Sequence, residues 1–240
     1  MIETAENLAP ECRITRDEAD EFAARSHRRA AAAWESGRFD DEVVFVDVPQ
    51  RRGELVRFDR DEGVRPDSTP ETLGRLRIIV PAGTVTAGTS SQQNDDAAAC
   101  LVVAEDKLGE LGLEPAGFLR GRAVAGCEPA TMGIGPVPAV RKLFDRTGVA
   151  FDDLDLIEVN EAFACQVLAV VKSRDVKKDE VADRLNANGS GISLGHTIGA
   201  TRVRILTAML HELRRRGGRL ARETMCIGGG QGMAALIETA

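Results

Sequence analysis

The alternation of apolar and polar residues along the chain predicts a protein in which helices and strands follow one another. The first clear element is a helix within residues 14–39, whose body is dominated by alanine. Thr15 and Glu18 stand three residues apart ahead of this body, which is the pattern of a capping box at a helix start. Gly37 is of the residue type that commonly ends a helix. These features predict one long amino-terminal helix.

A region of short strands and loops is expected next, up to residue 96. Residues 42–48 and 54–58 are rich in β-branched and aromatic side chains, so both are predicted to be strands. Residues 59–72 are polar and contain glycine and proline, which predicts a surface loop. Residues 76–80 fit a short strand, and a run of small residues follows them.

The pattern changes after residue 96. Residues 97–105 form a nearly continuous apolar run of strand length, which is typical of a strand buried on both faces. Further strands are expected at residues 117–126, 155–159, 223–230 and 232–238. Four helices are expected as well: one that includes Leu111, one at residues 137–148, one that begins at Glu161, and one at residues 199–218. The last two strands are separated only by a glycine bend, which predicts an antiparallel hairpin that closes the sheet.

Strands that alternate with helices indicate the α/β fold class, with a layered sheet. An irregular α+β segment precedes this layered part, and the boundary between them is predicted near Asn94. The two domains expected are therefore residues 1–94 and residues 95–240. Residues 95–118 belong either to the second domain or to a preceding core. The sequence contains no internal repeat.

Composition and charge restrict the classes of function. The 240-residue chain has a formal net charge of −7, which argues against a general binder of nucleic acid or membrane surfaces, because both need a positive face. A local basic groove for a phosphate-bearing small molecule is compatible with this charge. No apolar run approaches the roughly 20 residues that span a bilayer, and Met1 does not open a signal-peptide pattern. The expected location is the cytoplasm.

The five cysteines form no C-x-x-C pair and are odd in number, so they are expected to be free thiols in a reducing compartment. The same spacing gives no reason to expect a metal site. The chain has no tyrosine and one tryptophan, which argues against an aromatic surface for stacking bases. Neither a metal nor a nucleic-acid partner is expected.

Three stretches share one form, in which small residues present polar groups where a strand is expected to end. They are "VNEAF" (159–163), "SLGHTIGA" (193–200) and "MCIGGGQG" (225–232). In α/β sheets ligands bind outside the carboxyl ends of strands, so these loops are expected to converge on one site. Histidine, cysteine and asparagine together suit proton transfer and the positioning of a water molecule.

Each stretch also has a simpler interpretation. A histidine before a helix is more often a cap or a surface group, Cys226 alone is most simply a small buried side chain, and Asn160 is by default an N-cap. The run "GGGQG" lacks the lysine of a phosphate-binding P-loop, and the cations at Arg214 to Arg216 fit the end of a solvated helix. Taken one at a time, the stretches do not establish a site.

Taken together, "NEAF", "NGSGISLGH" and "MCIGGGQG" in this order resemble the carboxyl-terminal half of the thiolases, enzymes that make or cleave 3-ketoacyl-CoA. The stretches "TAENLA", "GRFDDEVV", "GTVTAG", "SSQQND" and "MGIGPVPA" fit the same family, and the similarity covers essentially the whole chain. The resemblance implies a layered αβα half with a mixed sheet. It also makes residues 1–94 part of the family's α+β loop domain, which binds coenzyme A, and 95–240 the carboxyl-terminal domain.

The resemblance implies four catalytic residues. His196 matches the histidine that helps to form an oxyanion hole and to activate a nucleophilic cysteine, and Cys226 matches the cysteine that shuttles a proton. Asn160 matches the asparagine that holds a water molecule in the oxyanion hole, and the backbone N–H of Gly228 belongs to a second such hole. Claisen chemistry passes through an enolate and a tetrahedral intermediate, and preorganised donors stabilise such oxyanions.

The resemblance also implies residues that contact coenzyme A or acyl-CoA, which are substrates rather than permanently bound cofactors. Ser91 matches a loop-domain serine, and Arg65 matches an arginine on the adenine side. Four further positions match residues that line the pocket: Ala87, Met132, Ala162 and Phe163. For Met132 and Phe163 simple core packing is the alternative.

Some features depart from the family's pattern. The nucleophilic cysteine of thiolases lies in their amino-terminal half, which this chain is expected to lack. Thr197 stands where the family usually has proline, and Asp96 and Arg202 stand where it usually has glycine. Arg202 early in a helix is expected to be tolerated only if it points to solvent.

The expected function is therefore that of a thiolase-type acyl-CoA acyltransferase, which catalyses Claisen condensation or thiolysis of 3-ketoacyl-CoA. It is expected to be inactive alone unless another chain supplies the nucleophilic cysteine. The alternatives are a noncatalytic CoA-binding or structural protein of the same fold and, on "GGGQG" alone, a nucleotide-binding module. Because one half would be missing, exposed apolar surface is expected to drive formation of a homo-oligomer or binding to a nucleophile-bearing partner.

Overall fold

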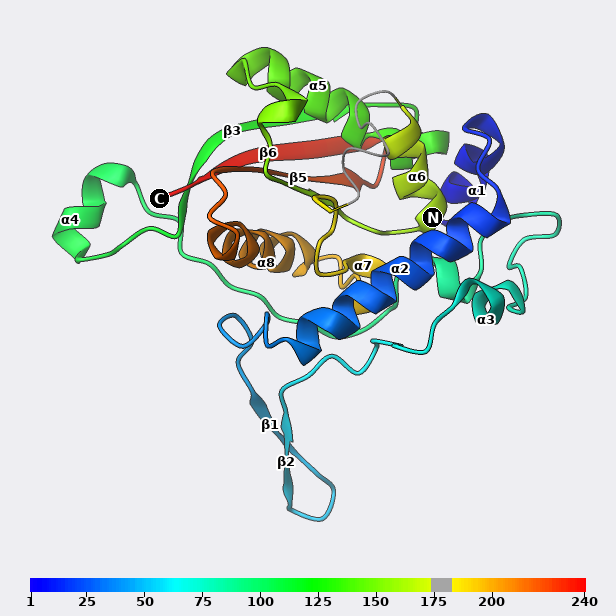
Figure 1. The fold of residues 1–240 in the computed structure, drawn as a ribbon, viewed down its shortest axis with the longest axis horizontal. Coiled ribbons are helices and arrows are strands. Elements are labelled where there is room, and N and C mark those ends of the chain that lie inside the picture. Colours follow the sequence, from blue (N-terminus) through cyan, green and yellow to red (C-terminus); the bar gives the residue numbers. More distant parts are fainter. Residues whose placement is uncertain (174–182) are drawn as a thin grey trace.

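The fold is that of a computed structural model, which describes residues 1–173 and 183–240 (Figure 1). Its helices are α1 (Ile2–Glu11), α2 (Arg16–Glu35), α3 (Pro70–Gly74), α4 (Leu108–Leu111), α5 (Pro136–Thr147), α6 (Ala164–Lys172), α7 (Gly191–Leu194) and α8 (Thr201–Arg215). Its strands are β1 (Val46–Pro49), β2 (Leu55–Phe58), β3 (Gly117–Gly126), β4 (Leu156–Val159), β5 (Leu220–Ile227) and β6 (Gln231–Thr239). Short 3₁₀ turns occupy Ala87–Thr89, Glu105–Lys107, Pro129–Ile134 and Phe151–Asp153.

The main sheet is mixed, as predicted. Its strands lie in the order β3-β6-β5-β4, with β3 and β5 antiparallel to β6 and with β4 parallel to β5. β5 and β6 form the closing hairpin expected from the glycine bend, and β3 spans the residues predicted for it. Because β4 and β5 are parallel neighbours, their carboxyl ends meet at one edge of the sheet.

Helices cover both faces of this sheet (Figure 1). Successive side chains of a strand point to opposite faces, and β4 shows the result. Ile157 packs in the large core that includes Leu143 of α5, whereas Leu156 packs with Met209 and Leu213 of α8. The α/β layered class and its αβα arrangement are therefore confirmed.

The long amino-terminal helix is present as α2, and its predicted capping box is formed. The Thr15 hydroxyl accepts from the Glu18 backbone N–H at 3.2 Å, and the Glu18 carboxylate accepts from the Thr15 N–H at 2.9 Å. Gly37 follows the helix with a φ of +68°, a conformation that favours glycine. α1 ahead of it was not expected, because it has no side-chain cap and contains Pro10.

The predicted strands at 42–48 and 54–58 pair as a separate antiparallel hairpin, β1–β2, which is shorter than expected. All residues of both strands are exposed. Figure 1 shows the hairpin projecting from the body of the molecule.

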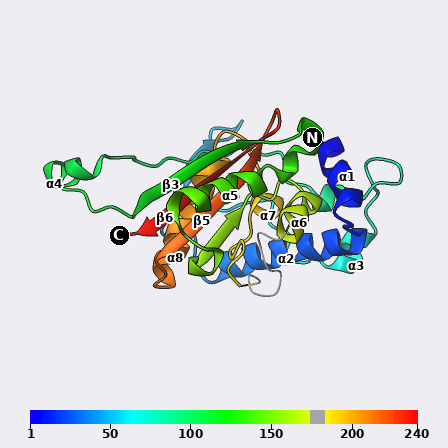
Figure 2. The same ribbon diagram turned by 90° about the horizontal axis from the view of Figure 1, so that it is seen from above.

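The prediction of a buried strand at residues 97–105 is wrong. Residues 97–104 have no regular secondary structure, and Leu101 and Val102 are 85% and 90% exposed. An apolar run becomes a buried strand only where neighbouring strands and helices enclose it, and here no described strand pairs with it. Figure 2 shows that the chain on either side of α4 leads far from the rest of the molecule.

Three further elements differ from expectation. Residues 76–80 form no strand, and only Ile78 makes an isolated bridge, to Thr86. The helix through Leu111 is a single turn, α4. The helix expected from Glu161 begins at Ala164, because Asn160 to Phe163 are not helical and bond to neighbouring segments instead.

Candidate active site

The ends of β4 and β5 bring two of the predicted loops together. The backbone N–H of Asn160, directly after β4, donates to the Thr224 carbonyl of β5 at 3.0 Å. Cys226 lies two residues further along β5. The loops "VNEAF" and "MCIGGGQG" therefore share one edge of the sheet, as their positions after parallel strands predicted.

The segment that leads into the third loop approaches the first loop closely at Gly191. A Cβ atom placed on Gly191 would lie 2.6 Å from the Glu161 carbonyl oxygen and 3.0 Å from the Asn160 Oδ1 atom. Only glycine allows the backbone of α7 to pass this close to the end of β4. The structure thus brings the neighbourhoods of Asn160, Cys226 and the turn before His196 together at one end of the sheet.

Asn160 is fully buried, with 0% exposure, and neither its Oδ1 nor its Nδ2 atom has a hydrogen-bond partner among the described residues. It is not the N-cap of α6, since Phe163 occupies that position without a side-chain bond. An unpaired buried amide costs about 1–3 kcal/mol, so such a group usually marks a place for water or a ligand.

His196 follows α7 and is held at both its backbone and its ring. Its backbone N–H donates to the Gln92 carbonyl at 3.2 Å, and its Nδ1 atom lies 2.8 Å from the Thr201 hydroxyl. Burial, with a smaller effect from Arg204, lowers the pKa of His196 below its usual 6.5. The ring is therefore neutral near pH 7 and carries both a donor and an acceptor nitrogen.

The turn after His196 has an unusual backbone. Ile198 has a φ of +59°, and the Gly199 N–H donates to the Thr197 carbonyl at 2.6 Å, which makes a three-residue γ-turn. A β-branched residue in this region of φ is strained, and Ile198 is also 81% exposed. The Thr197 hydroxyl donates to the Asp96 carboxylate at 3.3 Å, so two of the residues that depart from the family's pattern contact one another.

Cys226 lies in a small apolar cluster with Met132 and Ala162, against which Cys127 and Phe163 pack. Burial raises the pKa of Cys226 to about 11, so the group is a neutral thiol near pH 7. Three residues that the resemblance assigned to the pocket therefore surround the predicted proton shuttle. Simple packing of Met132 is compatible with the same geometry.

Ser91 and the 3₁₀ turn at Ala87–Thr89 lie beside this cluster. The Ser91 N–H donates to the Ala162 carbonyl at 2.9 Å, and Ser90 bridges to Phe163. Ala87 is exposed and Ser91 is half-buried, so both face accessible space next to the loop after β4.

Arg65 and Gly228 occupy more exposed positions. Arg65 is exposed, and its backbone N–H donates to the buried ring of His27 at 3.2 Å. Gly228 is exposed in the turn between β5 and β6, where the next two glycines have φ values of +87° and +90°. No hydrogen bond in the described residues joins either one directly to the cluster around Cys226.

Two supporting residues were not identified from the sequence. Glu161, 1% exposed, accepts from the Ser26 hydroxyl at 2.6 Å, from the Asn186 amide at 2.8 Å and from the Ile192 N–H at 3.3 Å. Gln92 donates to Gly63 and Ile192 carbonyls at 2.8 and 3.0 Å. Glu161 thus joins α2 to the turn ahead of His196. The sequence feature that could have identified Glu161 is its position in "VNEAF", next to Asn160.

Arg202 does not point to solvent, and that expectation is wrong. Its guanidinium Nη1 lies 3.3 Å from the Glu223 carboxylate, and the two side chains are 28% and 6% exposed. The positive charge is accommodated because a buried carboxylate of β5 pairs with it.

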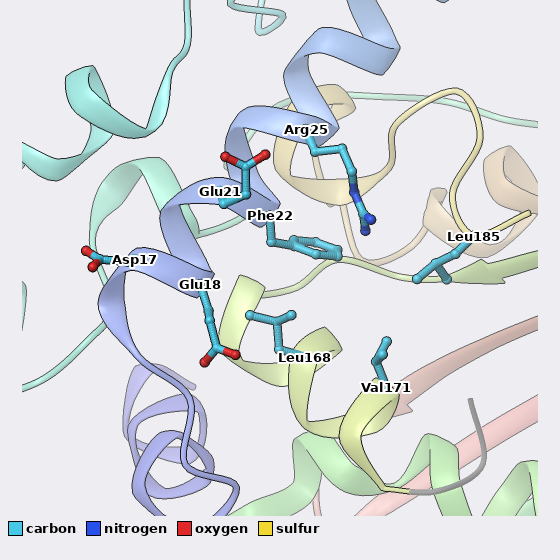
Figure 3. A pocket seen from close by; sticks show the side chains of 8 residues that line it. All are labelled: Asp17, Glu18, Glu21, Phe22, Arg25, Leu168, Val171 and Leu185. Carbon is cyan, nitrogen blue, oxygen red and sulfur yellow. The ribbon is translucent and has the colours of Figure 1, made fainter. Parts of the chain in front are cut away.

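A cavity of about 390 Å³ lies elsewhere, between α2 and α6 (Figure 3). Phe22, Leu168, Val171 and Leu185 provide its apolar walls, and none of the predicted site residues lines it. Within residues 1–173 and 183–240, three or more histidine, cysteine or acidic side chains do not gather in a way that would hold a metal ion. No helix in this part of the chain is long and apolar enough to cross a membrane.

The fold and the site define a layered α/β protein whose polar loops meet at the carboxyl ends of two parallel strands. Comparison with known families identifies it further. Residues 1–106 match the model of the thiolase N-terminal domain, and residues 113–239 match that of the thiolase C-terminal domain. The chain belongs to the thiolase family.

Relatives agree with this assignment. The chain is 48% identical to the acetyl-CoA acetyltransferase of Chromobacterium violaceum over 98% of its length and 59% of that protein. It is also 48% identical to the 3-ketoacyl-CoA thiolase of Idiomarina loihiensis, over 98% of this chain and 61% of that protein. The chain thus spans about three fifths of the length of these relatives.

Solved structures show the same fold. The Bacillus anthracis acetyl-CoA acetyltransferase matches with a TM-score of 0.94 and 45% identity, over 99% of this chain and 59% of that one. Human mitochondrial 3-ketoacyl-CoA thiolase in complex with CoA matches with a TM-score of 0.90 and 39% identity, over 100% of this chain and 59% of that one.

The match to the N-terminal domain corrects one expectation. The chain was expected to lack the family's amino-terminal half, but residues 1–106 match the thiolase N-terminal domain. The loop-domain stretches "TAENLA" to "SSQQND" had been assigned to a separate unit, whereas the family's N-terminal model includes them. The boundaries of the structural domains remain predictions.

Proposed function

We propose that this chain takes part in thiolase-type acyl transfer, the condensation or thiolysis of 3-ketoacyl-CoA. Membership of the family supports the class of reaction, and its relatives are named acetyl-CoA acetyltransferase and 3-ketoacyl-CoA thiolase. The observation that carries the proposal is the unpaired, fully buried amide of Asn160, at the point where the loop after β4 meets β5 and the start of α7.

The roles follow from what each group offers. The Asn160 amide has free donor and acceptor atoms with which to hold a water molecule, and neutral His196 offers an N–H to the thioester oxygen. Preorganised donors of this kind stabilise the oxyanion of an enolate or tetrahedral intermediate. Cys226, a neutral thiol in an apolar cluster, can return a proton to the α-carbon or to the leaving thiolate. The Gly228 N–H is proposed as a further oxyanion donor.

Acyl-CoA and CoA are the proposed substrates, without a permanently bound cofactor. Ser91, Ala87, Met132, Ala162 and Phe163 are proposed to contact the pantetheine arm and the acyl group, because they surround Cys226 or adjoin the loop after β4. Arg65, in an exposed position, is proposed to face the adenine side.

Association with a second copy or with a nucleophile-bearing chain is proposed as well. Apolar side chains at Leu101 and Val102 and along β1–β2 are exposed, and contiguous exposed apolar surface favours association. The five free cysteines suit a reducing compartment, and a cytoplasmic location is proposed for that reason.

Isothermal calorimetry of CoA and acetyl-CoA binding tests the site. Both ligands are expected to bind, and Ser91→Ala is expected to weaken both about fivefold, because a hydrogen bond contributes about 1 kcal/mol. Asn160→Ala is expected to weaken acetyl-CoA binding while leaving CoA binding unchanged, since only the thioester carbonyl reaches the water held by Asn160. Ser36→Ala is the matched control, because within the described residues the Ser36 hydroxyl bonds only to carbonyls at the end of α2.

Two results would contradict the proposal. If neither ligand binds at millimolar concentration, the chain has no such site. If ATP competes with CoA as strongly as acetyl-CoA does, the site recognises a nucleotide rather than a thioester. Binding of CoA without any discrimination by Asn160→Ala would favour a noncatalytic CoA-binding protein.

A further inference from the structure

The ion pair between Arg202 and Glu223 joins the start of α8, which contacts His196, to β5, which carries Cys226. Arg202 stands in the first turn of α8, and Glu223 lies in β5, where it is 4% exposed. Their side chains approach to 3.3 Å. The pair therefore fastens the beginning of a helix to the interior of the sheet.

The residue directly before Arg202 contacts His196 of the candidate active site. Thr201, directly before Arg202, is fully buried, and its hydroxyl lies 2.8 Å from the Nδ1 atom of His196. Cys226 follows Glu223 by three residues on the same strand. A displacement of the first turn of α8 relative to β5 would move the Thr201 hydroxyl away from His196.

The start of α8 lacks the groups that usually stabilise a helix N-terminus. Its N-cap residue, Ala200, makes no side-chain capping bond, and the first turn contains no acidic residue. A cation in the first turn opposes the helix dipole, so Arg202 is unfavourable there unless a nearby anion compensates it. Glu223 is that anion.

We propose that the Arg202–Glu223 pair positions the imidazole of His196 by holding the first turn of α8, and with it the Thr201 hydroxyl, against β5. Both members are positioning residues, since they act through Thr201 and do not touch the site. The inference rests on the proposed function only in so far as His196 is taken to be part of the site. It concerns a position, Arg202, where the family usually has glycine.

The charges around Glu223 indicate when the pair forms. Arg202 faces it from α8, the in-register partner on β4 is Glu158, and the in-register partner on β6 is the uncharged Ala235. Burial and the nearby carboxylates of Glu161 and Glu223 raise the pKa of Glu158, and Arg204 and Arg29 act in the opposite direction. Burial raises the pKa of Glu223 to about 7, against the opposing effect of Arg202. The ion pair is therefore complete above neutral pH and is lost as Glu223 takes up a proton.

Nitrogen and proton NMR of the histidine rings tests the proposal without any ligand. The chain has three histidines, and His27→Asn and His211→Gln assign the signals by elimination. In the wild type the chemical shift of the His196 ring, followed against pH, is expected to show a step with a midpoint near pH 7, where Glu223 titrates. This step is separate from the titration of the ring itself, because the pKa of His196 lies below its usual value of 6.5. Glu223→Gln and Arg202→Gln are expected to remove this step.

Two further comparisons separate positioning from a general structural effect. Glu238→Gln is the matched control, because Glu238 pairs with Arg219 at 2.8 Å at the opposite end of β5, and it is expected to leave the step unchanged. In a Thr201→Val background, Glu223→Gln is expected to have no further effect on His196, whereas Thr201→Ser retains the wild-type response.

Persistence of the step in a folded Glu223→Gln variant, or its loss in Glu238→Gln, would overturn the proposal. So would an equal effect of Glu223→Gln with and without the Thr201 hydroxyl. Because the measurement uses no CoA, a failure of CoA binding would count against the proposed function and leave this inference standing.

Discussion

Individual buried polar residues are the features by which this structure most clearly differs from a simple α/β core. Asn160 has no hydrogen-bond partner among the described residues, Glu161 has three, and Glu223 pairs with Arg202. Burying such groups costs free energy unless they are paired, so each needs a physical reason to be there. In our proposal all three act on the candidate site: Asn160 binds a water molecule, Glu161 fixes the turn ahead of His196, and Glu223 fixes the start of α8.

A buried histidine away from the reacting groups gives the first residue-scale prediction. His27 of α2 is 4% exposed, and burial, with a contribution from Arg65, lowers its pKa to about 4. Since the unfolded ring titrates near 6.5, protonation favours the unfolded state. The contribution of His27 to the free energy of unfolding is complete above pH 6.5 and is lost as the pH falls from 6.5 to 4.

Urea unfolding at several pH values checks this, with His27→Asn as the variant, because an asparagine oxygen can still accept from the Arg65 N–H. The wild type is expected to lose more stability than the variant between pH 6.5 and 4. Burial raises the pKa values of Glu42 and Glu223 to about 7, so these two groups add to the free energy of unfolding as the pH falls. Their contribution is the same in both proteins and therefore cancels when the two are compared. If the free energy of unfolding falls equally with pH in the wild type and in His27→Asn, the prediction is refuted.

The residue scale also shows what the sequence could and could not predict about the site. The strand ends and their loops followed from periodicity and glycine content, and they placed Asn160 and Cys226 at one edge. The pairing of Arg202 with Glu223 could not be predicted, because the two residues are distant in sequence and each taken alone is most simply a surface charge. Only the packing of α8 against β5 brings them together.

At the scale of elements, local signals were reliable where the element is stabilised locally. The capping box of α2 formed as predicted, and the β5–β6 hairpin followed from its glycine turn. Residues 97–105 were misassigned because an apolar run does not specify its own neighbours. The length of β1 and β2 was overestimated for a related reason, since an exposed hairpin is held only by its own cross-strand pairing.

The capping box gives an element-scale prediction. Thr15→Ala removes the hydroxyl that accepts from the Glu18 N–H, and it is expected to lower the free energy of unfolding by about 1 kcal/mol. Thr15→Ser, which keeps the hydroxyl, is expected to cost much less. Chemical unfolding followed by circular dichroism measures both, and an unchanged midpoint in Thr15→Ala would show that packing of α2 alone determines its stability.

At the scale of the whole molecule, the exposed apolar residues predict association. In sedimentation velocity at micromolar concentration the chain is expected to move as a species larger than its monomer mass of 25.8 kDa. A Leu101→Lys and Val102→Lys double variant is expected to shift the distribution toward the monomer. Glu110→Lys, which changes the net charge by the same amount at an exposed position, is the control.

A monodisperse wild-type monomer in this experiment would contradict the prediction. An equal shift caused by Glu110→Lys would assign the effect to net charge rather than to the apolar surface.

In the proposed function the end of the mixed sheet is an acyl-CoA site in which the Cys226 thiolate takes a proton from the α-carbon and the resulting thiol returns one. Exchange of the acetyl-CoA methyl protons with D₂O, followed by proton NMR, measures that step directly. The chain is expected to accelerate the exchange, and Cys226→Ser is expected to slow it by about 10²-fold or more, the usual contribution of a general acid or base. Cys127→Ser, which alters the neighbouring thiol of the same cluster, is expected to retain near wild-type exchange. Absence of exchange with the wild type, or equal rates for Cys226→Ser and the wild type, would contradict the account.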